Sequence, residues 1–133
     1  MPGGPITSTP ITSGSITTGA NSVTIVSPLV STGGATGLLV TAYLSGTPSA
    51  TQHVTAKLYQ GSGTGGTQVN PSAGTDVTMT GTTNDVRSWS WVDTSAAAVN
   101  AANAQYTVGF TASTGTNTIL YAWIQVQVLA PVS

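Results

Sequence analysis

The sequence predicts an all-β protein: an antiparallel β-sandwich of about seven or eight strands with an extended N-terminal arm. Three observations support this fold class. The chain has 133 residues, which is the size of one domain. It is rich in Thr, contains no Glu and has only 4% charged residues, a composition that disfavours helix. Hydrophobic and polar residues alternate in short segments that are separated by Gly, Pro and Asn.

Residues 1–20 predict a separate arm, and residues 21–133 predict the sandwich domain. The arm, MPGGPITSTPITSGSITTGA, contains three prolines and repeated Ile-Thr units, which favour extended chain. Ile6, Ile11 and Ile16 recur at a spacing of five, which fits neither one face of a strand nor one stripe of a helix. An isolated arm of this kind is disordered. We therefore expect a neighbouring subunit to hold it through these isoleucines.

Seven later segments alternate with period two, and an eighth strand is added if the arm or SPLVSTG pairs. One face of each segment is expected to fill the core, because side chains alternate across a strand. The residues expected to face the core are Val23, Ile25, Leu38, Val40, Ala42, Leu44, Val54, Ala56, Leu58, Val77, Met79, Tyr106, Val108, Phe110, Leu120, Ala122, Ile124, Val126 and Val128.

Residues 93–105, DTSAAAVNAANAQ, are the one segment with helical character. Ala is the best helix former, and Asp93 or Ser95 is suited to cap the N-terminus. One short turn of helix between strands is expected.

The last segment, TILYAWIQVQVLAP, predicts an interface. Its aliphatic face is core, so Tyr121, Trp123 and Gln125 point the other way, beside Gln127. Aromatic side chains with amides and no charges are typical of the centre of a protein–protein interface. Exposed on a monomer, they would form a patch that promotes aggregation.

Trp89 and Trp91 alternate with serines in DVRSWSWVD, and three interpretations stand. The indoles fill the core, contact another subunit, or form a platform on which a sugar stacks. If Val86 and Val92 face inward, the tryptophans face outward.

The composition of the chain argues against nucleic acid and membrane as partners. Lys57 and Arg87 are too few cations for nucleic-acid binding. No hydrophobic run approaches the roughly 20 residues of a membrane span.

The chain has no Cys, and its first residues do not resemble a secretory signal. A hydroxyl-rich surface without an export signal fits a virion protein that is made in the host cytoplasm and released by lysis, or a fragment whose signal was removed.

No catalytic, cofactor-binding or metal-binding residues are predicted. GSGTGG, residues 61–66, lacks the Lys and the helix of a phosphate-binding loop. His53 is the one histidine, and no GxSxG elbow accompanies it. Asp76, Asp85 and Asn84 are the strongest calcium donors, but they do not have ligand spacing. We expect a protein that is not an enzyme.

The succession VTIVSPLV, GLLVTAYLSG, HVTAKLYQGSGTGGTQV, SWSWVDTS and YTVGFTASTGTNTILYAWIQVQVL resembles a known group of modules. These are the small jelly-roll proteins of tailed-bacteriophage virions: accessory capsid (decoration or head-fibre) proteins and related fibre-tip domains. The resemblance covers roughly residues 21–130 and implies a jelly-roll sandwich. It also implies a trimer or other symmetric homo-oligomer, attached through a terminal arm to a major capsid or other virion protein at the capsid surface. It implies no individual site residues.

The expected function is therefore that of a structural virion protein that decorates or cements a capsid. The alternative is a carbohydrate-binding or adhesin module, such as a receptor-binding fibre.

Overall fold

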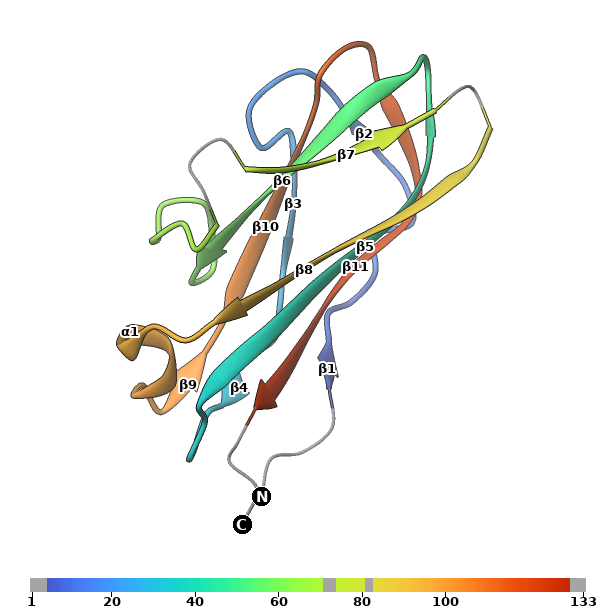
Figure 1. The fold of residues 1–133 in the computed structure, drawn as a ribbon. Helices are drawn as coiled ribbons and strands as arrows, with labels where there is room; N and C mark the ends of the chain where they lie inside the picture. Colours follow the sequence, from blue (N-terminus) through green and yellow to red (C-terminus); the bar gives the residue numbers. More distant parts are fainter. Residues whose placement is uncertain (1–4, 71–73, 81–82, 130–133) are drawn as a thin grey trace.

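Two antiparallel sheets pack face to face (Figure 1). This computed structural model describes residues 5–70, 74–80 and 83–129. In the first sheet, called the front sheet below, the strands lie in the order β1-β11-β5-β8, and β2 pairs with β11 farther along the strand. Its strands are β1 (Ile6–Thr7), β2 (Ser15–Ile16), β5 (Gly37–Pro48), β8 (Asp85–Asp93) and β11 (Asn117–Leu129).

The second sheet, called the back sheet, has the order β3-β10-β6-β7. A two-stranded sheet of β4 and β9 and one short helix, α1, complete the described chain. These elements are β3 (Val23–Val26), β4 (Val30–Ser31), β6 (Gln52–Gln60), β7 (Thr75–Met79), β9 (Asn103–Ala104), β10 (Tyr106–Ala112) and α1 (Ala96–Val99).

The strand order is that of a jelly roll. The front sheet contains β2-β11-β5-β8 and the back sheet contains β3-β10-β6-β7, so the chain passes repeatedly between the two layers. Eight strands in two sheets with this Greek-key order define the jelly roll. The predicted all-β, jelly-roll-like sandwich is confirmed.

The number of strands is higher than predicted. The described residues form eleven strands instead of seven or eight. Three strands beyond the jelly roll, β1, β4 and β9, are two residues long each. Pairs this short carry no hydrophobic alternation, so the pattern in the sequence does not reveal them.

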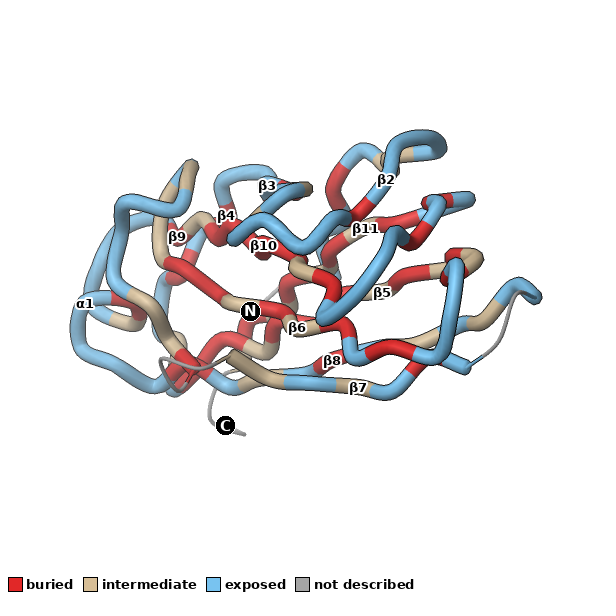
Figure 2. Tube along the Cα trace, turned by 90° about the horizontal axis from the view of Figure 1, so that it is seen from above, coloured by how far each residue is buried: buried red, intermediate tan, exposed pale blue. Residues whose placement is uncertain are grey.

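The core lies between the two sheets. Figure 2 shows buried residues recurring along the long strands of both layers. Each fully buried large side chain contributes about 1.5–3 kcal/mol. The largest fully buried side chains are Tyr106, Phe110, Ile16, Leu38, Leu44, Leu58, Met79, Ile119, Ile124, Val40, Val54 and Val108.

One predicted core residue, Leu120, points outward and is 43% exposed. The pairing of β11 with β5 shifts between Ile119 and Tyr121, which marks a β-bulge. A bulge inserts one residue and reverses the alternation on one side of it. Ile119 therefore takes the core position, at 2% exposure.

Helix α1 follows β8, as the alanines predict, and Ser95 occupies its N-cap. The carboxylate of Asp93 fixes this connection. It accepts hydrogen bonds from the Ser95 backbone N–H (3.0 Å), the Gln60 side-chain amide (2.8 Å) and the Tyr106 hydroxyl (2.9 Å). These bonds tie the start of α1 to both sheets.

Candidate functional site

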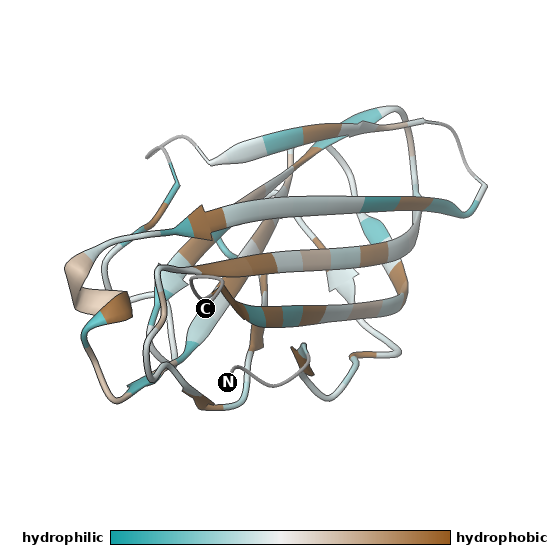
Figure 3. Ribbon diagram, turned by 60° about the horizontal axis from the view of Figure 1, so that its bottom comes forward, coloured by the Kyte–Doolittle hydropathy of each residue, from teal (hydrophilic) through white to brown (hydrophobic). Residues whose placement is uncertain are grey.

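The outer side of the front sheet is a continuous uncharged surface. The register of β11, β5 and β8 places side chains in four rows across the sheet. Figure 3 shows brown hydrophobic bands alternating with white and teal bands along these strands. We call this surface the uncharged face, and its rows are Gln127–Leu39–Val92, Gln125–Thr41–Ser90, Trp123–Tyr43–Ser88 and Tyr121–Ser45–Val86.

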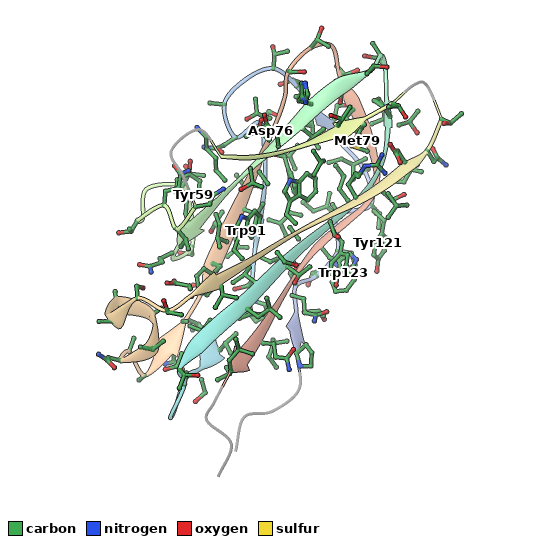
Figure 4. The ribbon with its side chains drawn as sticks, in the orientation of Figure 1. Tyr59, Asp76, Met79, Trp91, Tyr121 and Trp123 are labelled. Carbon is green, nitrogen blue, oxygen red and sulfur yellow. The ribbon has the colours of Figure 1, made fainter. Side chains whose placement is uncertain are left out.

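Aromatic rings occupy two adjacent rows of the uncharged face, toward the Tyr121 end. Trp123 and Tyr43 lie on neighbouring strands, and their rings stack with centroids 4.2 Å apart and planes 14° apart. Tyr121 stands beside them and is 46% exposed. Figure 4 shows the side chains of Tyr121 and Trp123 on the side of β11 that faces away from the sandwich. An open groove of about 250 Å³ runs between these two rings and Thr7, Ser8 and Pro10 of the arm.

The edge strand β8 adds hydrophobic surface to the uncharged face. Val86 is 66% exposed and Val92 is 53% exposed. Both valines lie on the outer side because Trp89 and Asp93, which alternate with them, are buried. Ser90 lies between the two valines on β8, and its hydroxyl shares a hydrogen bond with that of Thr41 on β5 (3.2 Å between oxygens).

The charges of the chain lie elsewhere. Lys57 and Asp76 are on the outer side of the back sheet, where the Thr55 hydroxyl donates to Asp76 (2.5 Å). Arg87 pairs with Asp85 (2.6 Å) at the start of β8, on the side of that strand that faces the back sheet. Asp93 is buried. The two cations and three acids of the sequence are thus all absent from the uncharged face.

The structure holds the described part of the arm against β11 of its own chain. Ile6 pairs with Val126, Ile11 with Ala122 and Ile16 with Asn117, all on β11. The expected interface role is therefore corrected for Ile16, which is completely buried in the core. Ile11 is partly buried against that core, and Ile6 remains 39% exposed.

Ser8 explains how an irregular arm follows a regular strand. Its backbone N–H donates to the Ile124 carbonyl (2.9 Å), and its hydroxyl accepts from the Ile124 N–H (3.0 Å). The side chain thus replaces a backbone partner where the arm is not a strand. Because the described arm residues complete the front sheet, they belong structurally to the sandwich.

Trp89 and Trp91 fill the gap between the sheets, which corrects the idea of a ligand platform. Trp89 is 3% exposed and lies 5.2 Å from the Phe110 ring. Its indole N–H donates to the Thr75 carbonyl (3.0 Å), and that of Trp91 donates to the Thr75 hydroxyl (3.1 Å). Of the three interpretations, the core position is the one that the structure supports.

Gln125 and Trp123 lie on the uncharged face as predicted, and both are half-buried. Gln125 has Thr7 and Thr41 as its cross-strand neighbours, and Trp123 has Tyr43. Tyr43 is the functional candidate that sequence reasoning missed. Tyr43 alternates with the core residues of β5, so its outward direction could be predicted from the sequence. Its position opposite Trp123 depends on which strands pair, and the alternation within a strand does not reveal that.

The sequence candidates for chemistry do not converge. His53 lies on the back sheet, with its ring nitrogen 3.3 Å from the Thr78 hydroxyl. The GSGTGG segment forms a loop after β6, closed by the Gln60 N–H donating to the Thr67 carbonyl (2.9 Å). Across residues 5–70, 74–80 and 83–129, no three His, Cys, Asp or Glu side chains gather at a metal-binding distance. In that same part of the chain, no helix has the length and hydrophobicity to cross a membrane.

The surroundings of Asp93 and Tyr106 shift the pKa values of these two side chains. Burial acts to raise the pKa of Asp93, but the hydrogen bonds from Gln60, Ser95 and Tyr106 outweigh it, and the pKa lies below its ordinary value of 3.8. Burial, the hydrogen bond to Asp93 and the charge of that carboxylate all raise the pKa of Tyr106. Both side chains position the start of α1 through these hydrogen bonds, which is a structural role.

Comparison of the chain with family models, with curated proteins and with solved structures finds no match.

Proposed function

We propose that this protein is a structural component of a virion: an oligomeric jelly roll that decorates or cements a viral capsid, without catalytic activity of its own. In this proposal the uncharged face is the surface that packs against other virion subunits. The protein is made in the host cytoplasm and ends at the capsid surface.

The observation that carries the proposal is the contrast between the two outer surfaces of the sandwich. Four rows of the uncharged face contain aromatic, aliphatic, hydroxyl and amide side chains. The back sheet carries Lys57, Asp76 and His53. Centres of protein interfaces are depleted in charge and enriched in Tyr and Trp. A surface of this composition is suited to burial against protein.

The stacked pair strengthens this argument. Trp123 and Tyr43 already contact each other in the single chain, at 4.2 Å between centroids. Their rotamers are fixed before a partner arrives, so little side-chain entropy is lost on binding. Aromatic residues of this kind supply much of the binding energy at protein interfaces.

The fold agrees with the proposal only as an analogy, since jelly rolls serve both viral capsids and lectins. The alternative function is therefore a carbohydrate-binding or adhesin module. The groove beside Tyr121 favours it, because it joins an exposed ring to the hydroxyls of Thr7 and Ser8. A ring next to hydrogen-bonding groups is what a sugar needs.

Immunogold electron microscopy of the particle fraction tests the two functions together. An antibody against the folded protein is applied to lysates of the cells that produce it, and gold is counted on capsids, on tail fibres and on cell surfaces. Label distributed over capsids supports decoration. Label confined to fibre tips or cell surfaces supports the adhesin instead, and label only in the soluble fraction would contradict both.

A further inference from the structure

Strand β8 is an edge strand that nothing in the described chain covers. It pairs with β5 on one side and ends the front sheet on the other (Figure 1). Its nine residues, DVRSWSWVD, contain no proline and no lysine. All four outward side chains, Val86, Ser88, Ser90 and Val92, are exposed. A long edge strand is a template for another strand. At Val86 the backbone N–H donates to the Asp85 carboxylate (3.1 Å) and the carbonyl accepts from Arg87 (2.9 Å), so pairing at this end of β8 has to displace these two side chains.

The other described edges are shorter and carry interruptions. The opposite edge of the front sheet is the arm, where β1 has two residues and Pro10 follows. In the back sheet, β3 has four residues and β7 has five, with Asp76 on the outer side of β7. Proline, charge and short length are devices that prevent edge pairing. β8 is long and has no proline, and its one ion pair, Arg87 with Asp85, is confined to the start of the strand.

The side chains that point inward from β8 hold the strand in place. Arg87 donates to the Thr78 carbonyl (3.1 Å), and the two indoles donate to Thr75. Three of its nine side chains are therefore anchored to β7. The edge is preorganised, so a partner strand does not have to order it.

The sequence of β8 is nearly palindromic about Trp89. In an antiparallel pair centred on that residue, Val86 lies opposite Val92 of the second chain, and Ser88 lies opposite Ser90. A two-fold interface requires this self-complementarity, in which residue i meets j and j meets i. Paired β-branched and paired hydroxyl side chains both stabilise antiparallel strands.

The charges at the ends of β8 are compatible with this register. It places Asp85 near Asp93 of the second chain. Asp85 is already paired with Arg87, and the carboxylate of Asp93 is turned inward to Gln60 and Tyr106. Arg87 lies opposite Trp91 of the second chain, where a guanidinium and an indole attract each other.

We infer that β8 pairs antiparallel with β8 of a second copy of this chain, about a two-fold axis at Trp89, and joins two front sheets into one. This inference deepens the proposed function, because it names the surface for self-association. It also makes the uncharged faces of two chains continuous. It does not depend on which capsid the pair binds.

The first test changes charge at two exposed positions that face each other across the axis. Ser88→Lys with Ser90→Lys places lysine opposite lysine on both sides of the axis. Ser88→Lys with Ser90→Glu places lysine opposite glutamate. The native mass is measured by light scattering, and circular dichroism and the melting temperature check the fold.

We expect twice the 13.2 kDa chain mass for the unmodified protein and for the Lys–Glu variant, and 13.2 kDa for the Lys–Lys variant. A Lys–Lys variant that keeps the mass of the unmodified protein would overturn the edge pairing, and so would an unmodified chain that is monomeric at high concentration. Neither result depends on the immunogold labelling, so failure of the inference and failure of the capsid proposal are separate.

The second test fixes the register, using the absence of native cysteine. Ser88→Cys and Ser90→Cys are prepared as separate chains, one of them with a tag, and are mixed under mild oxidation. We expect the mixed disulfide to form faster than either symmetric one, because positions 88 and 90 face each other. Ser45→Cys lies on β5, away from the edge, one row from Ser88 and two rows from Ser90 on the uncharged face; it is the control and should not cross-link. Equal rates in all mixtures would contradict the register.

Discussion

The ring of Trp123 on β11 lies flat on the ring of Tyr43 on β5, with the centroids 4.2 Å apart. Neither residue belongs to the core, and both belong to a sheet face without charge. This pair places fixed aromatic surface on the outside of the sandwich, and the proposed attachment to a shell depends on it.

Tyr121→Lys should weaken binding to capsids by about tenfold or more, because a charge would be buried in the contact. Tyr121 is 46% exposed, so the fold should not change. Val26→Lys is the matched control, since Val26 is 40% exposed on the back sheet. Co-sedimentation of the purified variants with capsids that lack the protein measures both affinities. Equal binding by the two variants would contradict the proposal that the uncharged face contacts the capsid.

Ile16→Ala should lower the free energy of unfolding by about 2–5 kcal/mol, the cost of a large cavity in a core. Ile16 is completely buried although it lies in the arm. Ile6→Ala, at a position that is 39% exposed, should cost less than about 1 kcal/mol. Urea denaturation measures both. If the two substitutions cost the same small amount, the arm does not complete the front sheet.

The arm shows where the sequence pattern stops being informative. Its isoleucines were expected to meet a neighbouring subunit, yet they line β11 of the same chain. The arm meets β11 in separate short contacts, at β1, Ser8, Ile11 and β2, so its isoleucines do not follow the period of one continuous strand. An irregular edge has no periodic signature.

The regular strands were predictable for the opposite reason. Leu38, Val40, Ala42 and Leu44 are all completely buried, as their alternation predicts. The alternation failed at Leu120, because a β-bulge shifts the phase and no local residue marks it. The aromatic pair was half predictable: each ring's direction follows from parity, but the pairing of β11 with β5 is a property of the whole topology.

Asp93→Asn should destabilise the protein by about 1–3 kcal/mol at neutral pH, because the hydrogen bonds to Asp93 are then no longer charge-assisted. The pKa of Asp93 is below 3.8 in the folded chain, so the unfolded chain binds the proton first as the pH falls. Asp93 therefore contributes its full stabilisation at pH values above the ordinary Asp pKa. This stabilisation is lost as the pH falls through the lower pKa of the folded chain. The gap between the variant and the unmodified protein should narrow on acidification.

Guanidinium unfolding between neutral pH and about pH 3 measures this gap. Asp76→Asn, on the outer side of the back sheet, is the control for the chemical change. A gap for Asp93→Asn that stays constant across the acid range would show that its carboxylate does not hold α1 as described.

Gly66→Ala should destabilise the protein by about 1–3 kcal/mol, as overpacking does. An added Cβ at Gly66 would overlap the Gln60 carbonyl oxygen, which is backbone and cannot rotate away. Gly65→Ala is the adjacent control, because nothing lies within 4 Å of a Cβ there. Its effect should stay within about 0.5 kcal/mol or be slightly stabilising. Thermal melting of the two variants compares them, and a Gly65 variant as unstable as the Gly66 variant would show that the loop is closed differently.

The most direct test of burial of the uncharged face is the reactivity of a single cysteine on that face. Ser45→Cys lies between Tyr121 and Val86, and Val26→Cys lies on the back sheet. The rate of maleimide labelling is measured for each variant, free in solution and bound to capsids. We predict that binding to the capsid slows labelling at position 45 strongly and leaves position 26 unchanged. Unchanged labelling at position 45, or protection at position 26 alone, would contradict the account.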